Sequence, residues 1–188
     1  MILVHIDGVE GDCTIEGFTK TANFTGYFVA ESFSFGVERE MKESGEKAGT
    51  EDINIGVGQL QECTISKSMD RASANLAKFA INGNSLGTAL IDFVEVAAGG
   101  MPVCYLRYKL DRCFVKSWTT NGSSDERPTE DVAFYYNKIA FAYLYTADGK
   151  KFSNGGTMTW DNVKNEPWET DIGLKAPTPS GLSISISL

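Results

Sequence analysis

Few side chains in this sequence could support catalysis or bind a metal ion. It contains one histidine, His5, and four cysteines, Cys13, Cys63, Cys104 and Cys113. A structural zinc site needs about four such ligands, usually with two of them closely spaced as in C-x-x-C. The sequence has no such pair, so we predict no metal site. The cysteines are typical of small core residues in a reducing compartment, with a disulfide as the alternative.

A catalytic nucleophile would depend on His5, because Ser-His-Asp and Cys-His sites both need an imidazole base. His5 lies in the alternating apolar segment 2–6, which is typical of a structural or surface histidine. Nothing follows the phosphate-binding pattern G-x-x-x-x-G-K-[ST], since Gly99 and Gly100 lack the lysine and the helix. We therefore predict no cofactor and no enzymatic activity. A carboxylate pair of the glycosidase type stays open, because acidic residues are plentiful.

The balance of charge disfavours nucleic acid and membrane partners. The 188 residues include 17 Lys and Arg and 25 Asp and Glu, a formal net charge of −8 at pH 7. This excess of negative charge repels phosphate backbones and anionic lipid surfaces. No segment approaches the roughly 18 consecutive apolar residues that span a bilayer, and none resembles a signal peptide. We expect one domain that starts in the cytoplasm and is exported, if at all, without a cleaved leader.

The elements that would position these residues are mostly β-strands. Residues 2–6 alternate and end at a turn signal, and in residues 27–37 apolar side chains recur at every second position. The apolar face of the second strand carries Tyr27, Val29, Phe33 and Phe35. Further strands are expected at residues 53–69, 85–97, 102–110, 112–120 and 152–160.

One helix is expected at residues 70–81. Its apolar side chains fall on a single face, with Asp70 as the N-cap and Asn82 and Gly83 at its end. A helix with one apolar stripe is expected to lie on a sheet.

Residues 132–146 form the most apolar stretch, and both faces of the strand that they predict are apolar. Such a strand would be about 50 Å long and would need cover on both sides, from a second sheet, a helix or another subunit. We predict that part of it packs against another subunit; the alternative is a bend that wraps it around one core. One of its faces carries Tyr135, Ile139, Phe141 and Tyr143.

Residues 38–52 lack a core face and are predicted to form a long loop that projects into solvent or into a neighbour. Its charged side chains include both signs: Arg39, Glu40, Lys42, Glu43, Glu46, Lys47, Glu51 and Asp52. Residues 162–188 are predicted to form a tail with one short terminal strand.

Taken in order, four segments resemble the Hcp family, the haemolysin-coregulated tube proteins of bacterial type VI secretion systems. They are ILVHIDGVEG, GYFVAESFSFGVERE, QLQECTISKSMDRASANLAKFAINGN and YLRYKLDRCFVKSWTTNGSSDERPTEDVAFYYNKIAFAY. The third contains D-[KR]-[AS]-[ST]-x-x-L from Asp70, and the fourth contains P-x-E-x-V-x-[FL] from Pro128. The resemblance covers residues 1–165 as one Hcp-like β-barrel domain, and leaves 166–188 as a C-terminal extension.

The resemblance implies a mainly β fold, in which two packed antiparallel or mixed sheets form a partly open β-barrel with one flanking α-helix. It also implies hexameric rings that stack into a tube inside a contractile sheath. The tube would be expelled behind a VgrG-type spike, would carry effectors in its lumen, and would be secreted or delivered into target cells. A tail-tube protein of a phage or other contractile injection particle, and a small carbohydrate-active β-sandwich protein, are the alternatives.

The resemblance assigns two roles to the residues above. The charged residues of 38–52 are expected to set ring stacking. The apolar residues of 27–37 and 132–146 are expected to form the contact between subunits.

Overall fold

The computed structural model describes residues 1–22, 25–43, 53–97, 100, 102–146, 152–176 and 184–185. This part of the chain is mainly β, with one helix, which confirms the predicted fold class. The elements are β1 (Ile2–Ile6), β2 (Phe28–Ala30), β3 (Ser32–Ser34), β4 (Val37–Glu43), β5 (Ile53–Leu60), β6 (Cys63–Ser68), α1 (Ser73–Asn82), β7 (Gly87–Val96), β8 (Pro102–Asn121), β9 (Thr129–Tyr135), β10 (Lys138–Thr146), β11 (Phe152–Asp161), β12 (Lys175–Ala176) and β13 (Ile184–Ser185).

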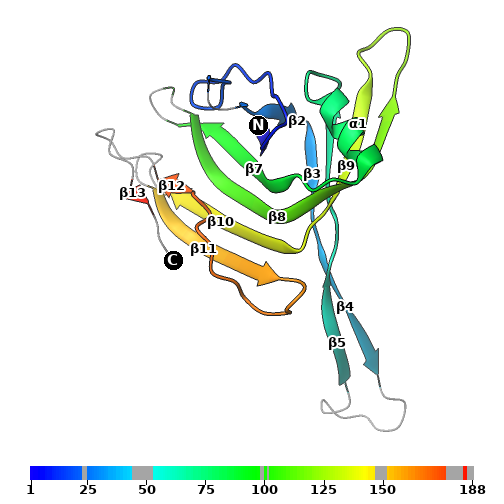
Figure 1. Ribbon diagram of the computed structural model, residues 1–188. Helices are drawn as coiled ribbons and strands as arrows, with labels where there is room; N and C mark the ends of the chain where they lie inside the picture. Colours follow the sequence, from blue (N-terminus) through cyan, green and yellow to red (C-terminus); the bar gives the residue numbers. More distant parts are fainter. Residues whose placement is uncertain are drawn as a thin grey trace.

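The main sheet is antiparallel and curls into a partly open barrel. Its strands follow the order β2-β1-β7-β8-β9-β6-β3, and β10 pairs with β8 and with β11 outside this path. The two end strands, β2 and β3, are separated in sequence by Glu31 alone, so the path returns to the stretch of chain where it began. Figure 1 shows β8 crossing the molecule, with β7 on one side and β10 and β11 on the other.

The two strands predicted at 102–110 and 112–120 are one continuous strand, β8. Arg112 has a φ of 49°, and the pairing of β8 with β7 shifts register near it, between Gly87 and Ala89. A residue with positive φ in a strand bends it without ending it. The half of β8 before the bend therefore pairs with β7 and β10, and the half after it pairs with β9.

The single long strand predicted at 132–146 is wrong, because the chain bends between β9 and β10. The Asn137 N–H donates to the carbonyl of Asp111 at 3.2 Å, and its own carbonyl accepts from the Asn162 N–H at 2.8 Å. The Tyr136 hydroxyl donates to the carbonyl of Gln61 at 2.6 Å. The bend wraps both halves around one core, which was the alternative interpretation.

The strand predicted at 27–37 is also divided. The Glu31 N–H donates to the carbonyl of Ser66 at 2.8 Å, where the chain passes from β2 to β3. Before this point Phe28 and Ala30 are buried and Val29 is exposed; after it, Phe33 faces the core. The apolar face predicted from odd positions is therefore wrong for β2, because the side-chain direction changes at Glu31.

Part of the long loop predicted at 38–52 is a strand. Residues 38–43 belong to β4, which pairs with β5 in an antiparallel hairpin from Val37 opposite Leu60 to Glu43 opposite Ile53. This hairpin extends away from the barrel (Figure 1). Residues 44–52 lie outside the described part of the chain.

The helix α1 begins at Ser73, three residues later than predicted. Asp70 is not its N-cap: its Oδ1 accepts the Ala72 N–H at 2.8 Å in the turn that precedes the helix. The predicted end is confirmed, because Gly83 adopts a φ of 66° and donates its N–H to the carbonyl of Phe79 at 3.1 Å. Leu76 is fully buried against the barrel.

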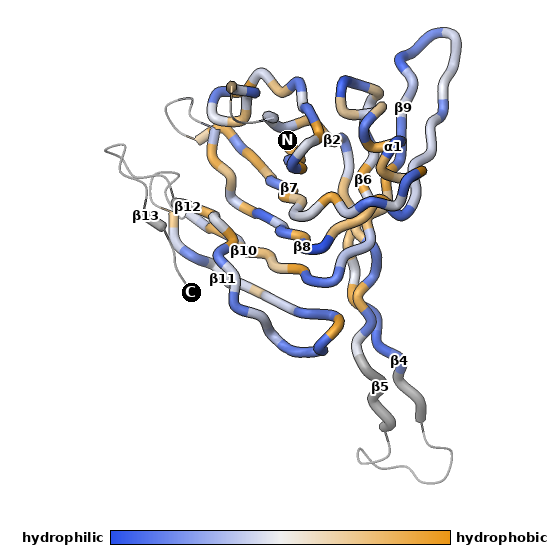
Figure 2. Tube along the Cα trace, viewed as in Figure 1, coloured by the Kyte–Doolittle hydropathy of each residue, from blue (hydrophilic) through white to orange (hydrophobic). Residues whose placement is uncertain are grey.

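The main core fills the barrel, and apolar residues line β7, β8 and β10 in Figure 2. Each of these strands alternates, so the side chains that do not enter the core point to the outer face. Fully buried core residues from the strands and helix include Val4, Ile6, Phe28, Cys63, Leu76, Ile91, Leu110, Cys113, Phe134 and Ile139.

Replacing Leu76 by Ala tests how α1 is held. We expect the free energy of unfolding to fall by about 2–5 kcal/mol, because the substitution leaves a cavity between the helix and the sheet. Ile81→Ala, on the exposed side of the same helix, is the matched control and should change stability by less than about 0.5 kcal/mol. Urea unfolding followed by circular dichroism gives both values; equal losses would place the helix elsewhere.

Candidate assembly surface and its buried support

The hairpin of β4 and β5 carries the first group of predicted site residues. Arg39 and Glu40 are exposed on β4, and Lys42 and Glu43 lie at its end, opposite Asn54 and Ile53. Arg39 lies over Gly58, where a Cβ would be 3.5 Å from its Nη2. The remaining residues predicted here lie outside the described part: Glu46, Lys47, Glu51 and Asp52.

An apolar groove lies at the root of this hairpin, with a volume of about 480 Å³. On one side it is lined by Val37 and Leu60, and on the other by Met158 and Trp160 of β11. Val37 is 59% exposed. The guanidinium of Arg39 supplies a positive charge at the edge. Exposed apolar surface with a charged rim is typical of a protein docking surface.

A row of aromatic rings leads from the core to the surface. The ring of Tyr108 lies 4.7 Å from that of Phe33, 5.9 Å from that of Phe35 and 5.2 Å from that of Phe141, measured between centroids. Phe33, Phe35 and Phe141 are half-buried. Three residues predicted for the subunit contact are therefore brought together, on the core side of the sheet.

The row ends at exposed tyrosines. Tyr105 makes an edge contact with Tyr143 at 6.3 Å, and Tyr143 and Tyr145 are both about half exposed. Gly155 passes beneath them, since a Cβ there would lie 2.7 Å from Cδ1 of Tyr143. The glycine therefore lets the tyrosines lie against β11.

The other predicted contact residues are separate from this row. Val29 and Tyr135 are exposed on β2 and β9. Tyr27 and Ile139 are buried, at 5% and 0% exposure, so their side chains support the surface from within the chain.

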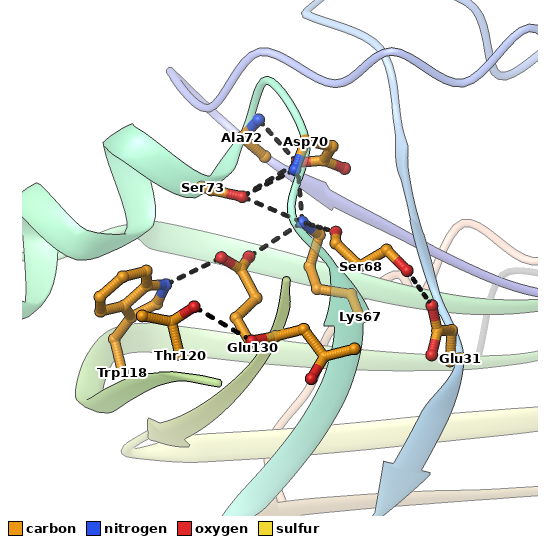
Figure 3. Close-up of polar contacts among 10 residues, drawn as sticks. Glu31, Lys67, Ser68, Asp70, Ala72, Ser73, Trp118, Thr120 and Glu130 are labelled. Carbon is orange, nitrogen blue, oxygen red and sulfur yellow. Dashed lines mark hydrogen bonds and ion pairs between the residues drawn. The ribbon is translucent and has the colours of Figure 1, made fainter. Parts of the chain in front are cut away.

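Between β6, β9 and the turn before α1, Lys67 forms a buried ion network (Figure 3). Its Nζ lies 2.9 Å from Oε1 of Glu130 and 2.7 Å from Oδ1 of Asp70, and it donates to the carbonyl of Ser68 at 2.9 Å. The indole N–H of Trp118 donates to the second oxygen of Glu130 at 3.1 Å. The side chains of Lys67 and Glu130 have no exposed surface.

This network joins the two motifs of the sequence. Asp70 and Ser73 come from the first motif and Glu130 from the second, and the Ser73 hydroxyl also accepts from Lys67 at 3.4 Å. Sequence reasoning missed Lys67. Its signal is alternation, because Lys67 shares a strand face with Cys63 and Ile65, which are buried.

A second buried network lies on the outer face of β7 and β8. The guanidinium of Arg107 donates to Asp92 from Nε at 2.7 Å and from Nη2 at 2.6 Å. The Tyr27 hydroxyl donates to the same carboxylate at 2.9 Å. Burial and the nearby charge of Asp92 raise the pKa of Tyr27 above its ordinary value, so the hydroxyl remains a donor.

The histidine and the cysteines, which are the residues best suited to catalysis, have structural positions in the fold. His5 is 8% exposed and lies 3.3 Å from the Thr25 hydroxyl, and burial lowers its pKa below 6.5 despite the nearby Asp7 and Asp92 carboxylates. All four cysteines are free, and burial raises the pKa of Cys63 to about 12. The described residues contain no cluster of acidic, histidine or cysteine side chains able to hold a metal ion. No described helix has the length and hydrophobicity to span a membrane.

Lys67→Met tests the support given by the ion network. We expect it to lower the free energy of unfolding by about 3–5 kcal/mol, because two carboxylates lose their buried counter-charge. Lys116→Met breaks an ion pair with Glu62 on the surface and should cost less than about 1 kcal/mol. Denaturant titration of both variants makes the comparison, and similar small losses would contradict a supporting role for Lys67.

Known proteins share this sequence pattern and fold. The family model "Type VI secretion system effector, Hcp" matches residues 4–143. A solved type six secretion system protein is 22% identical with a TM-score of 0.75, and the match covers 89% of this chain and 98% of that one. Hcp1 from Salmonella typhimurium is 22% identical with a TM-score of 0.63, covering 89% and 97%.

Secreted protein Hcp3 from Pseudomonas aeruginosa is 17% identical, with a TM-score of 0.54 and coverage of 85% and 97%. At these identities the solved structures show the fold alone. Among curated protein sequences, none matches this chain. Because the family model matches residues 4–143, which is most of the chain, the chain belongs to the Hcp family of type VI secretion system proteins.

Proposed function

We propose that this chain is the structural subunit of the inner tube of a type VI secretion system, with no catalytic role. In this proposal six copies form a ring and the rings stack. The observation that carries it is the projecting hairpin of β4 and β5 with an apolar groove at its root, on the fold of the Hcp family. A surface of this kind suits contact with another copy of the chain.

The lateral contact in a ring is heterologous, because cyclic assembly joins two different patches of identical subunits. Among the apolar residues of 27–37 and 132–146 that are predicted to form this contact, Val29, Tyr135 and Tyr143 are exposed. Phe33, Phe35 and Phe141 lie in the half-buried aromatic row, where Phe141 is on the same face of β10 as Tyr143. Burying the exposed aromatic surface would favour association.

Contact between rings is assigned to residues 38–52. Arg39 and Glu40 are exposed near the root of the hairpin, and the segment contains charges of both signs. Opposite charges on facing rims fix the register of two surfaces more than they add affinity.

The proposed partners follow from this place in the secretion system: sheath proteins around the tube, a VgrG-type spike at its tip, and effector cargo in the lumen. In this proposal the subunit is cytoplasmic before firing and is then secreted by the type VI system itself. The names of the matched proteins, "effector" and "secreted protein", support this route.

Ring formation is tested by size-exclusion chromatography with light scattering. We expect the mass of six chains at micromolar concentration, and rings with a central hole in negative-stain images. Tyr143→Glu should shift the mass to that of one chain, because it places a charge in the lateral contact. Ile81→Glu, on the exposed side of α1, should leave the ring intact. A stable wild-type monomer would count against the proposal.

Deleting residues 42–49 tests the contact between rings. We expect rings of normal mass that no longer grow into tubes, as measured by electron microscopy and sedimentation. If the deletion leaves both ring formation and tube growth unchanged, the hairpin has no stacking role.

Salt gives a separate test of stacking. Six chains at −8 each carry −48 per ring, so like charges on facing rings repel one another. Added salt screens this repulsion, and tube length at constant protein concentration should therefore increase between 50 and 500 mM NaCl, values chosen to shorten the Debye length from about 14 to 4 Å. Tubes that shorten with salt would contradict a repulsive contact.

A further inference from the structure

The segment 168–174 lies against the outer face of β8 and β10, opposite the barrel core. Ile172 and Leu174 are each 5% exposed and pack on Ala140 and Ala142 of β10. Because the alanine side chains are short, they leave space above the sheet, and the larger side chains of Ile172 and Leu174 fill it. The segment is therefore anchored, although the family match ends at residue 143.

Arg107 supplies the main polar contact with this segment. One edge of its guanidinium is fixed by Asp92, which is fully buried, and by the hydroxyl of Tyr27 at 3.3 Å. The remaining nitrogen, Nη1, donates to the carbonyl of Gly173 at 2.9 Å and to that of Ile172 at 3.4 Å. Because Asp92 orients the guanidinium from the neighbouring strand β7, Arg107 is positioned independently of the segment that it binds.

Lys109 makes a second contact with the main chain. Its Nζ donates to the carbonyl of Asp171 at 2.8 Å and to the hydroxyl of Thr170 at 2.8 Å. In register, Lys109 lies opposite Ala140 and Arg107 lies opposite Ala142. The sheet thus presents two cations beside two small side chains, a surface suited to backbone carbonyls and to aliphatic side chains.

Trp168 anchors the start of the segment. Its indole N–H donates to the carbonyl of Ile139 at 3.2 Å. The ammonium groups of Lys138 and Lys109 lie 4.9 and 5.7 Å from the ring centroid, within the range of cation–π attraction.

Gly173 is required by geometry. Its φ is 68°, and a Cβ there would lie 3.1 Å from Nη1 of Arg107. The Asp171 side chain accepts the Gly173 N–H at 2.8 Å and forms the turn that aims both carbonyls at Arg107. A larger residue at 173 would both strain the backbone and displace the guanidinium.

We propose that the outer face of β8 and β10 is a peptide-binding site and that residues 168–174 are its resident ligand, held as a releasable strap. The strap joins no strand ladder among the described residues; side-chain donors and apolar anchors hold it. The site selects a segment with an aromatic residue followed, four and six positions later, by aliphatic residues that flank a glycine in a turn.

The test uses the full chain, cut after folding. A specific protease site is inserted in the turn at residues 163–165, where Val163 is 69% exposed, and the cleaved protein is mixed with a fluorescent synthetic peptide of residues 166–176. We expect the cut fragment to remain bound during size exclusion and to be replaced by excess labelled peptide, as measured by fluorescence anisotropy.

The controls change the peptide and leave the protein untouched, so folding cannot confuse the result. The Gly173→Val peptide should bind at least about tenfold more weakly. The Glu169→Gln peptide, altered at an exposed position, should bind within about twofold of the parent. Failure of the labelled peptide to enter, or equal affinity of the Gly173→Val peptide, would overturn the proposal.

Discussion

A buried ammonium places the strictest constraint on this fold. Lys67 has no exposed surface, so its charge needs acceptors from the protein itself. It finds them on Glu130 of β9, on Asp70 in the turn before α1 and on its own strand, while Trp118 of β8 completes the shell of Glu130. Three strands and the start of the helix must therefore meet at one point.

The sheet of β7, β8 and β10 has other parts of the chain packed on both faces, although Tyr143 and Tyr145 near the end of β10 remain about half exposed. One face packs into the barrel core. On the other, Arg107 and Asp92 lie beneath two separate segments, since Tyr27 bonds to Asp92 and Gly173 bonds to Arg107. This explains the two apolar faces of β10: Ile139 enters the core and Ala142 lies under the strap. For the face of β10 that carries Ala142, the C-terminal segment supplies the cover, while contact of its other face with a second subunit stays a prediction.

Local sequence pattern predicted the elements whose causes are local. Alternation identified most strands, and Gly83 ended the helix because it tolerates the left-handed conformation. The bend at Glu31 was missed, the bend at Arg112 was predicted as a boundary between two strands, and the bend at Asn137 was only the alternative interpretation, because each depends on a hydrogen bond or a register shift with a distant strand. Hydropathy assigns apolar positions to a core, but it cannot say that a strand will be divided between two layers.

Some residues of the candidate site could be predicted from local sequence pattern, and others depend on distant parts of the chain. The exposure of Arg39 could be predicted from its charge, and that of Tyr143 from its place near the end of an alternating strand. Lys67 was missed because lysine is rarely buried, and only its partners, brought from distant segments, make that burial tolerable. The strap was missed because Trp168, Ile172 and Leu174 follow neither the helical nor the strand period, so their packing depends on the surface that they meet.

The two kinds of surface lie on opposite sides of one sheet. Met158 pairs in register with Phe141, so the groove at the hairpin root and the aromatic row share the core side of β10 and β11. Ala140 and Ala142, which alternate with Phe141, point to the strap. A neighbouring subunit that docks at the groove therefore need not displace the strap. Release of the strap, in turn, would expose Ala142 and Arg107 without opening the groove, so the chain can keep assembly and peptide binding on separate faces.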